Sequence, residues 1–253
     1  MLLIAAYLLR RRAEESMALD KEGKIIEVLN PSEDVCMVRF EPPVSCKPGQ
    51  FISVLREEMG KPIRKPYSIA STVDEHTYSE LCVRIVPGEF STWICSHKPG
   101  DLLRFKGPFG GFILQDQADN DLVFAATGTG ISSIRPMVFL ALKRWGVREK
   151  GEPGGIIVRL FFGVRTWDGL LYKEDWERLT REYANFRFIP CLSREARDGA
   201  YRGYVQNALL ETPEGFKGED IYICGVEKMV QETVEAAKKM GFPKEKIHFE
   251  EYV

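Results

Sequence analysis

Two patterns of hydrophobic and polar positions divide the chain. From about residue 24 to residue 106, hydrophobic and polar residues alternate over short runs, and Pro and Gly separate these runs. Alternation with a period of two places every second side chain on the same face, so the pattern predicts short β-strands and favours an antiparallel β-barrel or sandwich. The predicted strands are 24–29, 35–40, 50–55, 67–70, 81–86 and 102–106. A short helix is predicted at 91–96, with Ser91 as its N-terminal cap.

After about residue 116, strand-like runs alternate with segments whose hydrophobic residues recur at helical spacing. In the last of these segments, Val226, Met229, Val230, Val234 and Ala237 form one hydrophobic face. Strand–helix alternation predicts an α/β domain, a doubly wound parallel sheet with helices on both faces. The predicted strands are 122–126, 156–162, 187–191, 221–224 and 247–249, and the predicted helices are 131–145, 173–183, 205–210 and 226–240.

These patterns predict an N-terminal extension at 1–17, a β-barrel domain at 18–116 and an α/β domain at 117–253. The first nine residues are nearly all apolar, and three arginines follow them. Nine residues are too few to cross a bilayer, which requires about 20. A secretory signal carries its charges before the apolar run, not after it. We interpret the extension as an extended or disordered start, with a short interfacial membrane anchor as the alternative.

Composition narrows the classes of function. The 253 residues carry a net charge of −2, which gives no basic footprint for nucleic acid. The six cysteines form no Cys-x-x-Cys pair and no Cys/His cluster with metal-binding spacing. We therefore expect no metal site, and we expect the cysteines to be reduced in a cytoplasmic protein.

A glycine-rich turn lies at the first strand-to-helix junction of the predicted α/β domain. Gly128, Thr129 and Gly130 stand between predicted strand 122–126 and predicted helix 131–145. The N-terminus of a helix offers unpaired N–H groups, and glycine lets the backbone approach a ligand closely, so the turn favours a diphosphate. An ordinary tight turn is the alternative.

A second group of candidate residues lies in the barrel half. One short segment carries a cation (Lys65), an aromatic ring (Tyr67) and a hydroxyl (Ser68). A cation pairs with a diphosphate, an aromatic ring stacks on a planar ring, and a hydroxyl hydrogen-bonds a heterocycle nitrogen. With the glycine-containing loops 87–92 and 107–112, the segment predicts a flavin nucleotide site. A basic strand with a core tyrosine is the alternative.

The motifs occur in the order typical of one family. They are Pro66-Tyr67-Ser68, Gly88-x-x-Ser91, Gly107-Pro108-Phe109-Gly110, Gly128-Thr129-Gly130-Ile131, Cys224-Gly225 followed by Met229, and Glu250-Glu251-Tyr252. Over residues 24–252 the chain resembles the ferredoxin–NADP⁺ reductase superfamily, in which an FAD-binding barrel precedes a pyridine-nucleotide domain. The family has an arginine where this chain has Lys65, so either Lys65 or its neighbour Arg64 is expected to contact the flavin diphosphate.

The resemblance implies roles for individual residues. Tyr67 stacks on the flavin ring, and Ser68 hydrogen-bonds near its reactive nitrogen. The implied catalytic residues, which form a polar set around the hydride path, are Ser68, Cys224, Glu250 and Tyr252. FAD contacts are implied for Lys65, Pro66, Tyr67, Ser68, Arg84, Ile85, Phe90, Ser91 and Thr92. Contacts to the nicotinamide nucleotide are implied for Gly128, Thr129, Gly130, Arg165, Ser193, Arg194, Arg202, Cys224 and Gly225.

The resemblance also implies a reaction. It is that of an FAD-containing enzyme that transfers a hydride from NADPH or NADH to flavin and then single electrons to an acceptor. The cluster of Arg194, Arg197 and Arg202 suits a 2′-phosphate and favours NADPH, although the Ser-Arg pair also occurs in members that use NADH.

The acceptor is expected to be a separate redox protein, because the sequence carries no iron–sulfur or haem-binding motif. A ferredoxin, a flavodoxin, a haem protein and an oxygenase component all fit. One alternative is a reductase of free flavin or ferric chelates. Another is an electron-transfer or regulatory subunit of a larger redox complex, against which the lack of a C-terminal cysteine cluster argues.

Overall fold

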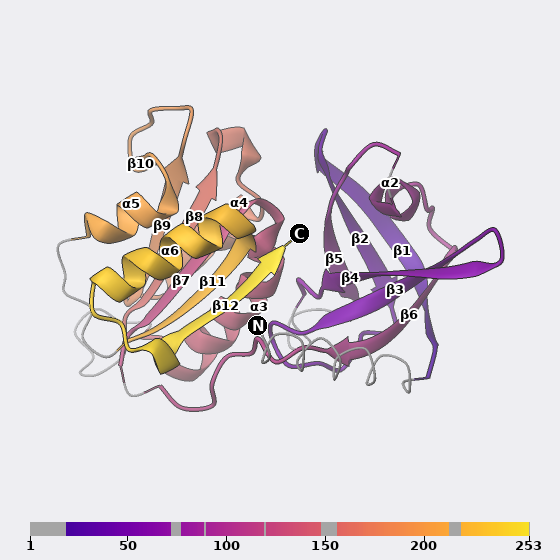
Figure 1. Ribbon diagram of the computed structural model, residues 1–253, viewed down its shortest axis with the longest axis horizontal. Helices are drawn as coiled ribbons and strands as arrows, with labels where there is room; N and C mark the ends of the chain where they lie inside the picture. The colour runs from indigo at the N-terminus through magenta and orange to yellow at the C-terminus, as the bar shows by residue number, and fades with distance from the viewer. Residues whose placement is uncertain are drawn as a thin grey trace. The chain divides into compact units, whose positions relative to one another are not determined.

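The computed structural model describes residues 19–71, 77–88, 90–118, 120–147, 156–212 and 219–252. The chain divides into two compact units, the first ending at Gly111 and the second beginning at Phe112 (Figure 1). The extension expected at 1–17 lies outside the described residues, as does Glu89 in the loop expected at 87–92.

The first unit is an antiparallel sheet of six strands in the order β4-β3-β6-β1-β2-β5. The strands are β1 (Lys21–Ser32), β2 (Val35–Glu41), β3 (Phe51–Glu58), β4 (Lys61–Ser68), β5 (Ser79–Arg84) and β6 (Leu102–Phe109), and the helix is α2 (Phe90–Cys95). A single bridge between Ile69 and Leu81 links the two ends of the sheet, where the Ala70 N–H also donates to the Glu80 carbonyl at 2.8 Å. The predicted antiparallel barrel is confirmed.

The hydrophobic positions of the alternating pattern form the core of this unit. Ile25, Val38, Val54, Leu81 and Leu103 come from five different strands and are fully buried. Burying such aliphatic side chains contributes about 1.5–3 kcal/mol each relative to exposure, which is what selects one face of each strand. The core therefore follows from the period of two in the sequence.

Strand β4 begins six residues before the predicted strand at 67–70, at Lys61. It pairs with β3 through a tight turn in which Met59 has φ +50° and Gly60 has φ +73°. Because β4 is at the edge of the sheet, its early residues are exposed and carry no alternation of hydrophobic and polar positions. The sequence pattern therefore detects only its last residues.

A disulfide joins Cys36 on β2 to Cys95, the last residue of α2. The expectation that all cysteines are reduced is therefore wrong for this pair. The two residues are 59 positions apart in the sequence, and only the packing of α2 against β2 brings them together. Cys46, Cys82, Cys191 and Cys224 are free thiols.

We predict that denatured, unreduced protein reacts at four thiols and reduced protein at six, because the disulfide leaves four free cysteines. Closing a loop of 59 residues limits the unfolded chain, so the Cys36→Ser/Cys95→Ser variant should lose about 4 kcal/mol of unfolding free energy. Thiol titration in guanidinium, after alkylation at harvest, gives the count. Six reactive thiols without reductant would show that Cys36 and Cys95 are not bonded, and that the sequence-based expectation of reduced cysteines was right.

The second unit is a parallel sheet of six strands in the order β10-β9-β8-β7-β11-β12. The strands are β7 (Leu122–Thr127), β8 (Val158–Val164), β9 (Phe186–Leu192), β10 (Tyr201–Arg202), β11 (Asp220–Val226) and β12 (Ile247–Tyr252). The α-helices are α3 (Ile131–Trp145), α4 (Lys173–Glu182), α5 (Val205–Leu210) and α6 (Glu227–Lys239). The predicted doubly wound α/β fold is confirmed, and the two-residue strand β10 is an addition to it.

Helices cover both faces of this sheet (Figure 1). Helices α5 and α6 pack through Leu209, Val230 and Ala237 on the face that carries Val123 and Ile223. On α3 and α4, Phe139 and Trp176 contact each other edge to face, and Trp176 stacks on Phe188 of β9 at 5.9 Å. The two hydrophobic faces of the sheet are thus each buried by one pair of helices.

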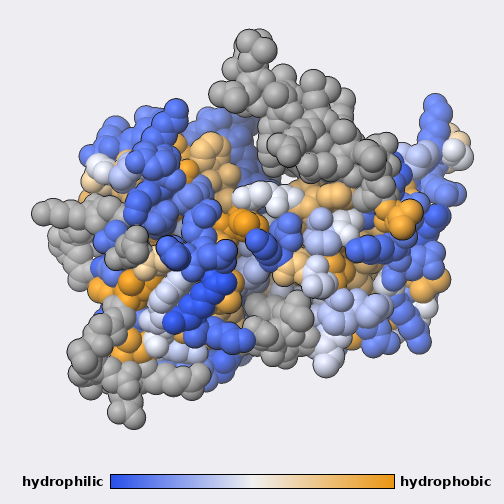
Figure 2. Space-filling model, turned by 90° about the horizontal axis from the view of Figure 1, so that it is seen from below, coloured by the Kyte–Doolittle hydropathy of each residue, from blue (hydrophilic) through white to orange (hydrophobic). Residues whose placement is uncertain are grey.

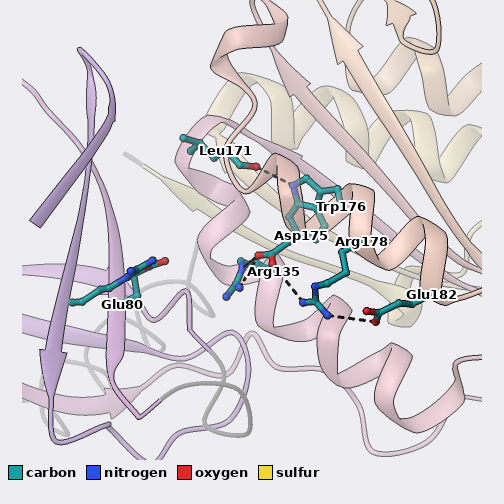
Figure 3. A network of polar contacts seen from close by, with 8 residues as sticks. Glu80, Arg135, Leu171, Asp175, Trp176, Arg178 and Glu182 are labelled. Carbon is teal, nitrogen blue, oxygen red and sulfur yellow. Dashed lines mark hydrogen bonds and ion pairs between the residues drawn. The ribbon is translucent and has the colours of Figure 1, made fainter. Parts of the chain in front are cut away.

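Helices α3 and α4 are also joined by a polar chain (Figure 3). The buried Arg135 lies 2.7 Å from the Asp175 carboxylate, which also contacts Arg178 at 3.5 Å, and Arg178 in turn contacts Glu182 at 3.4 Å. A buried guanidinium requires such a partner because an uncompensated charge there is destabilising. This series of ion pairs therefore fixes how α3 packs against α4.

The segment after Gly111 belongs to the second unit, although the sequence places the boundary at 116. The Phe112 ring contacts the Tyr222 ring, and the Gln115 N–H donates to the Tyr222 hydroxyl at 3.2 Å. Gln115, the first residue of the expected linker, is therefore bound to strand β11 of the parallel sheet.

Hydrophilic residues cover much of the surface seen in Figure 2. Among the described residues, no helix is both long and apolar enough to cross a membrane.

Candidate functional site

The carboxyl ends of the parallel strands lie at one edge of the second sheet. Strands β7, β8, β9 and β11 end at Thr127, Val164, Leu192 and Val226, and the segments that follow them carry most of the predicted nucleotide-binding residues. In doubly wound sheets, ligands bind at this edge where neighbouring strands lead to opposite faces. The architecture therefore places these residues where a nucleotide site is expected.

The glycine turn brings the start of α3 against the end of β11. A Cβ atom added to Gly130 would lie 2.4 Å from the carbonyl oxygen of Cys224 and 2.8 Å from Cα of Gly225, so only glycine fits. Gly128 has a left-handed φ of +52°. Among the described residues no side chain caps α3, and its first turn contains no acidic residue. The N–H groups of this turn can therefore bind an anion.

A buried hydroxyl beside this turn lacks a hydrogen-bond partner among the described residues. It is Oγ1 of Thr127, and it lies 2.3 Å from where a Cβ atom on Gly225 would stand. A buried hydroxyl without a partner costs about 1–3 kcal/mol, so a ligand group that pairs with it would be favoured. The orphan hydroxyl, the tight glycines and the uncapped helix fit a nicotinamide nucleotide. The sequence patterns did not identify Thr127.

A compact polar cluster lies at the ends of β11 and β12. Ser133, in the first turn of α3, lies 3.3 Å from the Glu250 carboxylate, 3.0 Å from the Tyr252 hydroxyl and 3.7 Å from the Cys224 sulfur. The Tyr252 hydroxyl also lies 3.1 Å from that of Ser132. The structure thus brings together three of the four implied catalytic residues. The fourth, Ser68, lies in the first unit on β4.

Burial controls the protonation of this cluster. Burial, and then the charge of Glu250, raise the pKa of the Cys224 thiol, while the hydrogen bonds with Ser133 and Tyr252 act in the opposite direction. Burial is also the main cause that raises the pKa of the Tyr252 phenol well above its usual value. Both groups are therefore neutral donors at physiological pH.

The ends of β8, β9 and β10 carry the arginines expected near the adenosine. Arg165, Arg194 and Arg202 are exposed, and no ion pair to them occurs among the described residues. The register pairs Val164 with Leu192 and Leu192 with Arg202. Arg165, Arg194 and Arg202 therefore lie at or just after the ends of three adjacent strands, at one edge of the sheet. Ser193, half-buried between them, donates its N–H to the Val164 carbonyl at 3.0 Å.

Two charged residues in the same loops have local partners instead. The Arg197 guanidinium lies 4.1 Å from the centre of the Trp167 ring, and Glu195 accepts a hydrogen bond from the Trp167 N–H at 2.7 Å. Arg197 and Glu195 are themselves 4.0 Å apart. These contacts fix the β8 and β9 loops against each other, and they give Arg197, although it is exposed, local side-chain partners that Arg165, Arg194 and Arg202 lack among the described residues.

In the first unit, the predicted flavin residues lie on β4 and around α2. Tyr67 is half-buried and stacks against Phe90 at 6.4 Å with an angle of 24° between the rings. Ser68 is buried, whereas Lys65 and Pro66 are exposed on the same edge strand. An edge strand that ends in an aromatic ring and a hydroxyl, next to exposed cations, fits a planar ring that carries a phosphate chain.

The hydroxyls of Ser91 and Thr92 close the loop that precedes α2. The Ser91 Oγ accepts a hydrogen bond from the Val86 N–H at 2.9 Å, and the Thr92 hydroxyl donates to the Val86 carbonyl at 2.9 Å. The prediction that Ser91 caps the helix is wrong, because α2 begins at Phe90 and Ser91 lies within it. The predicted cap position came from preference for serine at helix starts, which its bond to Val86 overrides.

The remaining predicted residues of this loop differ in exposure. Arg84 ends β5 and is exposed, and Ile85 is half-buried and donates its N–H to the Asp34 carbonyl at 2.8 Å. Gly88 has a left-handed φ of +75°. The loop therefore presents a cation and an accessible backbone turn.

Two family models match the chain in the order of its two units. An oxidoreductase FAD-binding domain matches residues 22–113, and an oxidoreductase NAD-binding domain matches residues 124–235. Curated relatives include a subunit of the Na⁺-translocating NADH-quinone reductase, from Neisseria meningitidis and from Yersinia pestis, 30% identical over 221 and 223 residues. Each match covers 80% of this chain and 51% of the relative, so the chain spans about half the length of these curated relatives.

Solved structures share the fold over nearly the whole chain. A cytochrome P450 reductase of Amycolatopsis has a TM-score of 0.79 and 28% identity, with 93% of this chain and 71% of that chain covered. A ferredoxin NADP⁺ reductase from Neisseria gonorrhoeae with bound FAD and NADP has a TM-score of 0.77 and 22% identity, with 92% of this chain and 98% of that chain covered. At its lower identity, the second shows likeness of fold alone.

Proposed function

The chain belongs to the ferredoxin–NADP⁺ reductase superfamily and is an FAD-dependent NAD(P)H oxidoreductase, and from this premise we propose that it uses NADPH to reduce a separate redox protein. The observation that carries this proposal is the nucleotide edge of the second unit: tight glycines, an uncapped helix and the orphan Thr127 hydroxyl. When bound, the flavin supplies a ring that accepts a hydride and passes electrons on singly.

In this proposal the chain binds and orients the two cofactors. Tyr67 and Ser68 hold the flavin ring, and Lys65 or Arg64 pairs with its phosphates. The N–H groups at Gly128–Gly130 bind the diphosphate of the nicotinamide nucleotide. Cys224 on β11 and Glu250 on β12 orient the nicotinamide ring and exclude water from it.

The preference for NADPH rests on Arg165, Arg194 and Arg202. A guanidinium binds a phosphate with two parallel hydrogen bonds, so cations without ion pairs to the described residues at this edge fit a 2′-phosphate. In these loops Glu195 accepts a hydrogen bond from the Trp167 N–H, so one of its carboxylate oxygens is already engaged. NADH as the donor is the alternative, because the curated relatives are NADH-quinone reductase subunits.

We predict that Arg194→Ala raises KM for NADPH about tenfold, the value of one lost charge-assisted contact, and changes KM for NADH less than twofold. Steady-state kinetics with both donors measure this. Arg187→Ala is the matched control, since Arg187 lies at the opposite end of β9 and bonds the carbonyls of Ala184 and Phe186. Equal effects on NADPH and NADH would contradict the proposed phosphate contact.

A second candidate function is an electron-transfer subunit of a larger membrane-associated complex. The names of the curated relatives favour it. In that case the acceptor is another subunit, and the chain would be isolated with a partner in fixed ratio.

Turnover with NADPH and NADH against a panel of acceptors separates these functions. The panel contains a ferredoxin, a flavodoxin, a cytochrome, free FMN and a ferric chelate. Acceleration by one protein carrier over the small acceptors supports the proposal. Faster turnover with free flavin or ferric chelate than with any carrier would favour the flavin or ferric reductase alternative, and a stoichiometric co-purifying partner would favour the subunit.

A further inference from the structure

We propose that Ser133 is a positioning residue of the nicotinamide site, because its one hydroxyl sets the direction of the hydrogen bonds made by Cys224, Glu250 and Tyr252. The proposal deepens the proposed function in one respect, namely that these residues face the nicotinamide ring. Ser133 lies outside the sequence motifs, which pass from Gly130-Ile131 directly to Cys224.

The position of Ser133 makes it a common neighbour of three functional groups. It is fully buried in the first turn of α3, and its Oγ lies between the ends of β11 and β12. From there it is 3.0 Å from the Tyr252 hydroxyl, 3.3 Å from the Glu250 carboxylate and 3.7 Å from the Cys224 sulfur. Every change in Ser133 therefore acts on all three.

Counting protons fixes the direction of these bonds. An ionised carboxylate only accepts hydrogen bonds, so the single hydroxyl proton of Ser133 is donated to Glu250. The Ser133 oxygen is left to accept, and the Cys224 thiol donates to it. The hydroxyl pair formed with Tyr252 must also run from Tyr252 to Ser133.

Ser132 also restricts the direction in which the Tyr252 hydroxyl donates its proton. Its hydroxyl donates to the Thr129 carbonyl at 2.7 Å, so its oxygen too can only accept from Tyr252, at 3.1 Å. Neither serine can donate to the phenol, so Tyr252 donates toward them, and its hydroxyl also hydrogen-bonds Cys224. The S–H bond of Cys224 and the O–H bond of Tyr252 thus both point at the first turn of α3, toward the charge of Glu250.

This arrangement has a chemical consequence for the strand ends. A thiol whose proton is bound to Ser133 presents its sulfur lone pairs in a fixed direction. A carboxylate that accepts the Ser133 hydrogen bond keeps its orientation at Glu250, which is half-buried on β12. Without Ser133, the thiol rotates and the carboxylate loses a buried donor, although the fold of the sheet is unchanged.

Ser132 provides a matched control within the same helical turn. It is buried like Ser133 and contacts the same Tyr252 hydroxyl, but among the described residues it makes no hydrogen bond to Cys224 or Glu250. If the first turn has a merely structural role, the hydrogen bond of Cys224 should change in both alanine variants alike. If Ser133 is a positioning residue, that bond should change in Ser133→Ala alone.

The test measures the S–H stretching band of Cys224 by infrared spectroscopy, with Cys224→Ser to assign the band among the free thiols. We expect Ser133→Ala to move this band to higher frequency and Ser132→Ala to leave it in place. In stopped-flow reduction, Ser133→Ala should lower the limiting rate about three- to tenfold, the value of one hydrogen bond, with the nucleotide Kd changed less than twofold. Ser132→Ala should lower the limiting rate less than Ser133→Ala does, because Ser132 bonds Tyr252 but neither Cys224 nor Glu250 among the described residues.

An unmoved band in Ser133→Ala, or the same shift in both variants, would overturn the proposal. Ser133→Thr retains the hydroxyl and should keep the band of the parent protein, which supports the proposal even where the alanine variant folds poorly. The band is measured without cofactor turnover. If NAD(P)H failed to reduce the flavin while the band moved as expected, the proposed function would fail and the positioning by Ser133 would remain.

Discussion

Replacing Gly130 with alanine is expected to lower the unfolding free energy of the second unit by about 3 kcal/mol and to weaken NAD(P)H binding about 100-fold. The added Cβ would lie 2.4 Å from the Cys224 carbonyl oxygen and 2.8 Å from Cα of Gly225. Both contacts are with backbone, which cannot rotate away, so α3 has to move from the end of β11. That movement displaces the N–H groups that we propose bind the diphosphate.

Chemical denaturation and equilibrium nucleotide titration measure the two effects of this substitution. Gly111→Ala is the control, because Gly111 is exposed, has no left-handed φ, and no atom lies within 4 Å of the added Cβ. The control should match the parent protein in both measurements. Unchanged nucleotide affinity in Gly130→Ala would mean that the start of α3 does not bind the nucleotide.

Replacing Cys224 with serine is expected to slow reduction of the flavin by NADPH by at least about tenfold while changing the nucleotide Kd less than twofold. Cys224 is fully buried at the end of β11, where its sulfur contacts Ser133. Serine is smaller and a stronger hydrogen-bond donor and acceptor, so it retains the fold but moves the atom against which we propose the nicotinamide ring lies. The loss therefore falls on the rate and not on binding.

Single-turnover reduction over a range of NADPH concentrations separates the rate from binding. Cys191→Ser is the matched control, a buried free cysteine on β9 of the same sheet. Because burial and Glu250 raise the pKa of the Cys224 thiol, the parent enzyme should show no rate change from thiol ionisation around neutral pH. A Cys224→Ser rate equal to that of the control would make Cys224 a structural residue.

The sequence predicts those parts of the fold that depend on local periodicity. Helices α3 and α5 have the predicted bounds, since their hydrophobic residues recur at helical spacing and turns flank them. Strand β4 begins earlier than predicted because an exposed edge strand needs no buried face. The two residues of β10 form a strand only by pairing with β9, which no local pattern can encode.

The candidate site divides in the same way. Glycines and aromatic residues in ordered motifs are visible in the sequence, because each requires a particular residue type at a particular place. The Cys36–Cys95 disulfide, the orphan hydroxyl of Thr127 and the contacts of Ser133 depend on segments far apart in the chain. Serine and threonine are also common at turns, so their presence alone indicates no function. The roles assigned to individual residues stay predictions until the variants are measured.

The flavin content of the purified protein, followed by its reduction with NADPH under anaerobic conditions, tests the central claim most directly. The account predicts a yellow protein that releases stoichiometric FAD and no FMN on denaturation, and whose flavin absorbance bleaches when NADPH is added. A colourless protein that takes up no FAD on titration, or a bound FAD that neither NADPH nor NADH reduces, would contradict it.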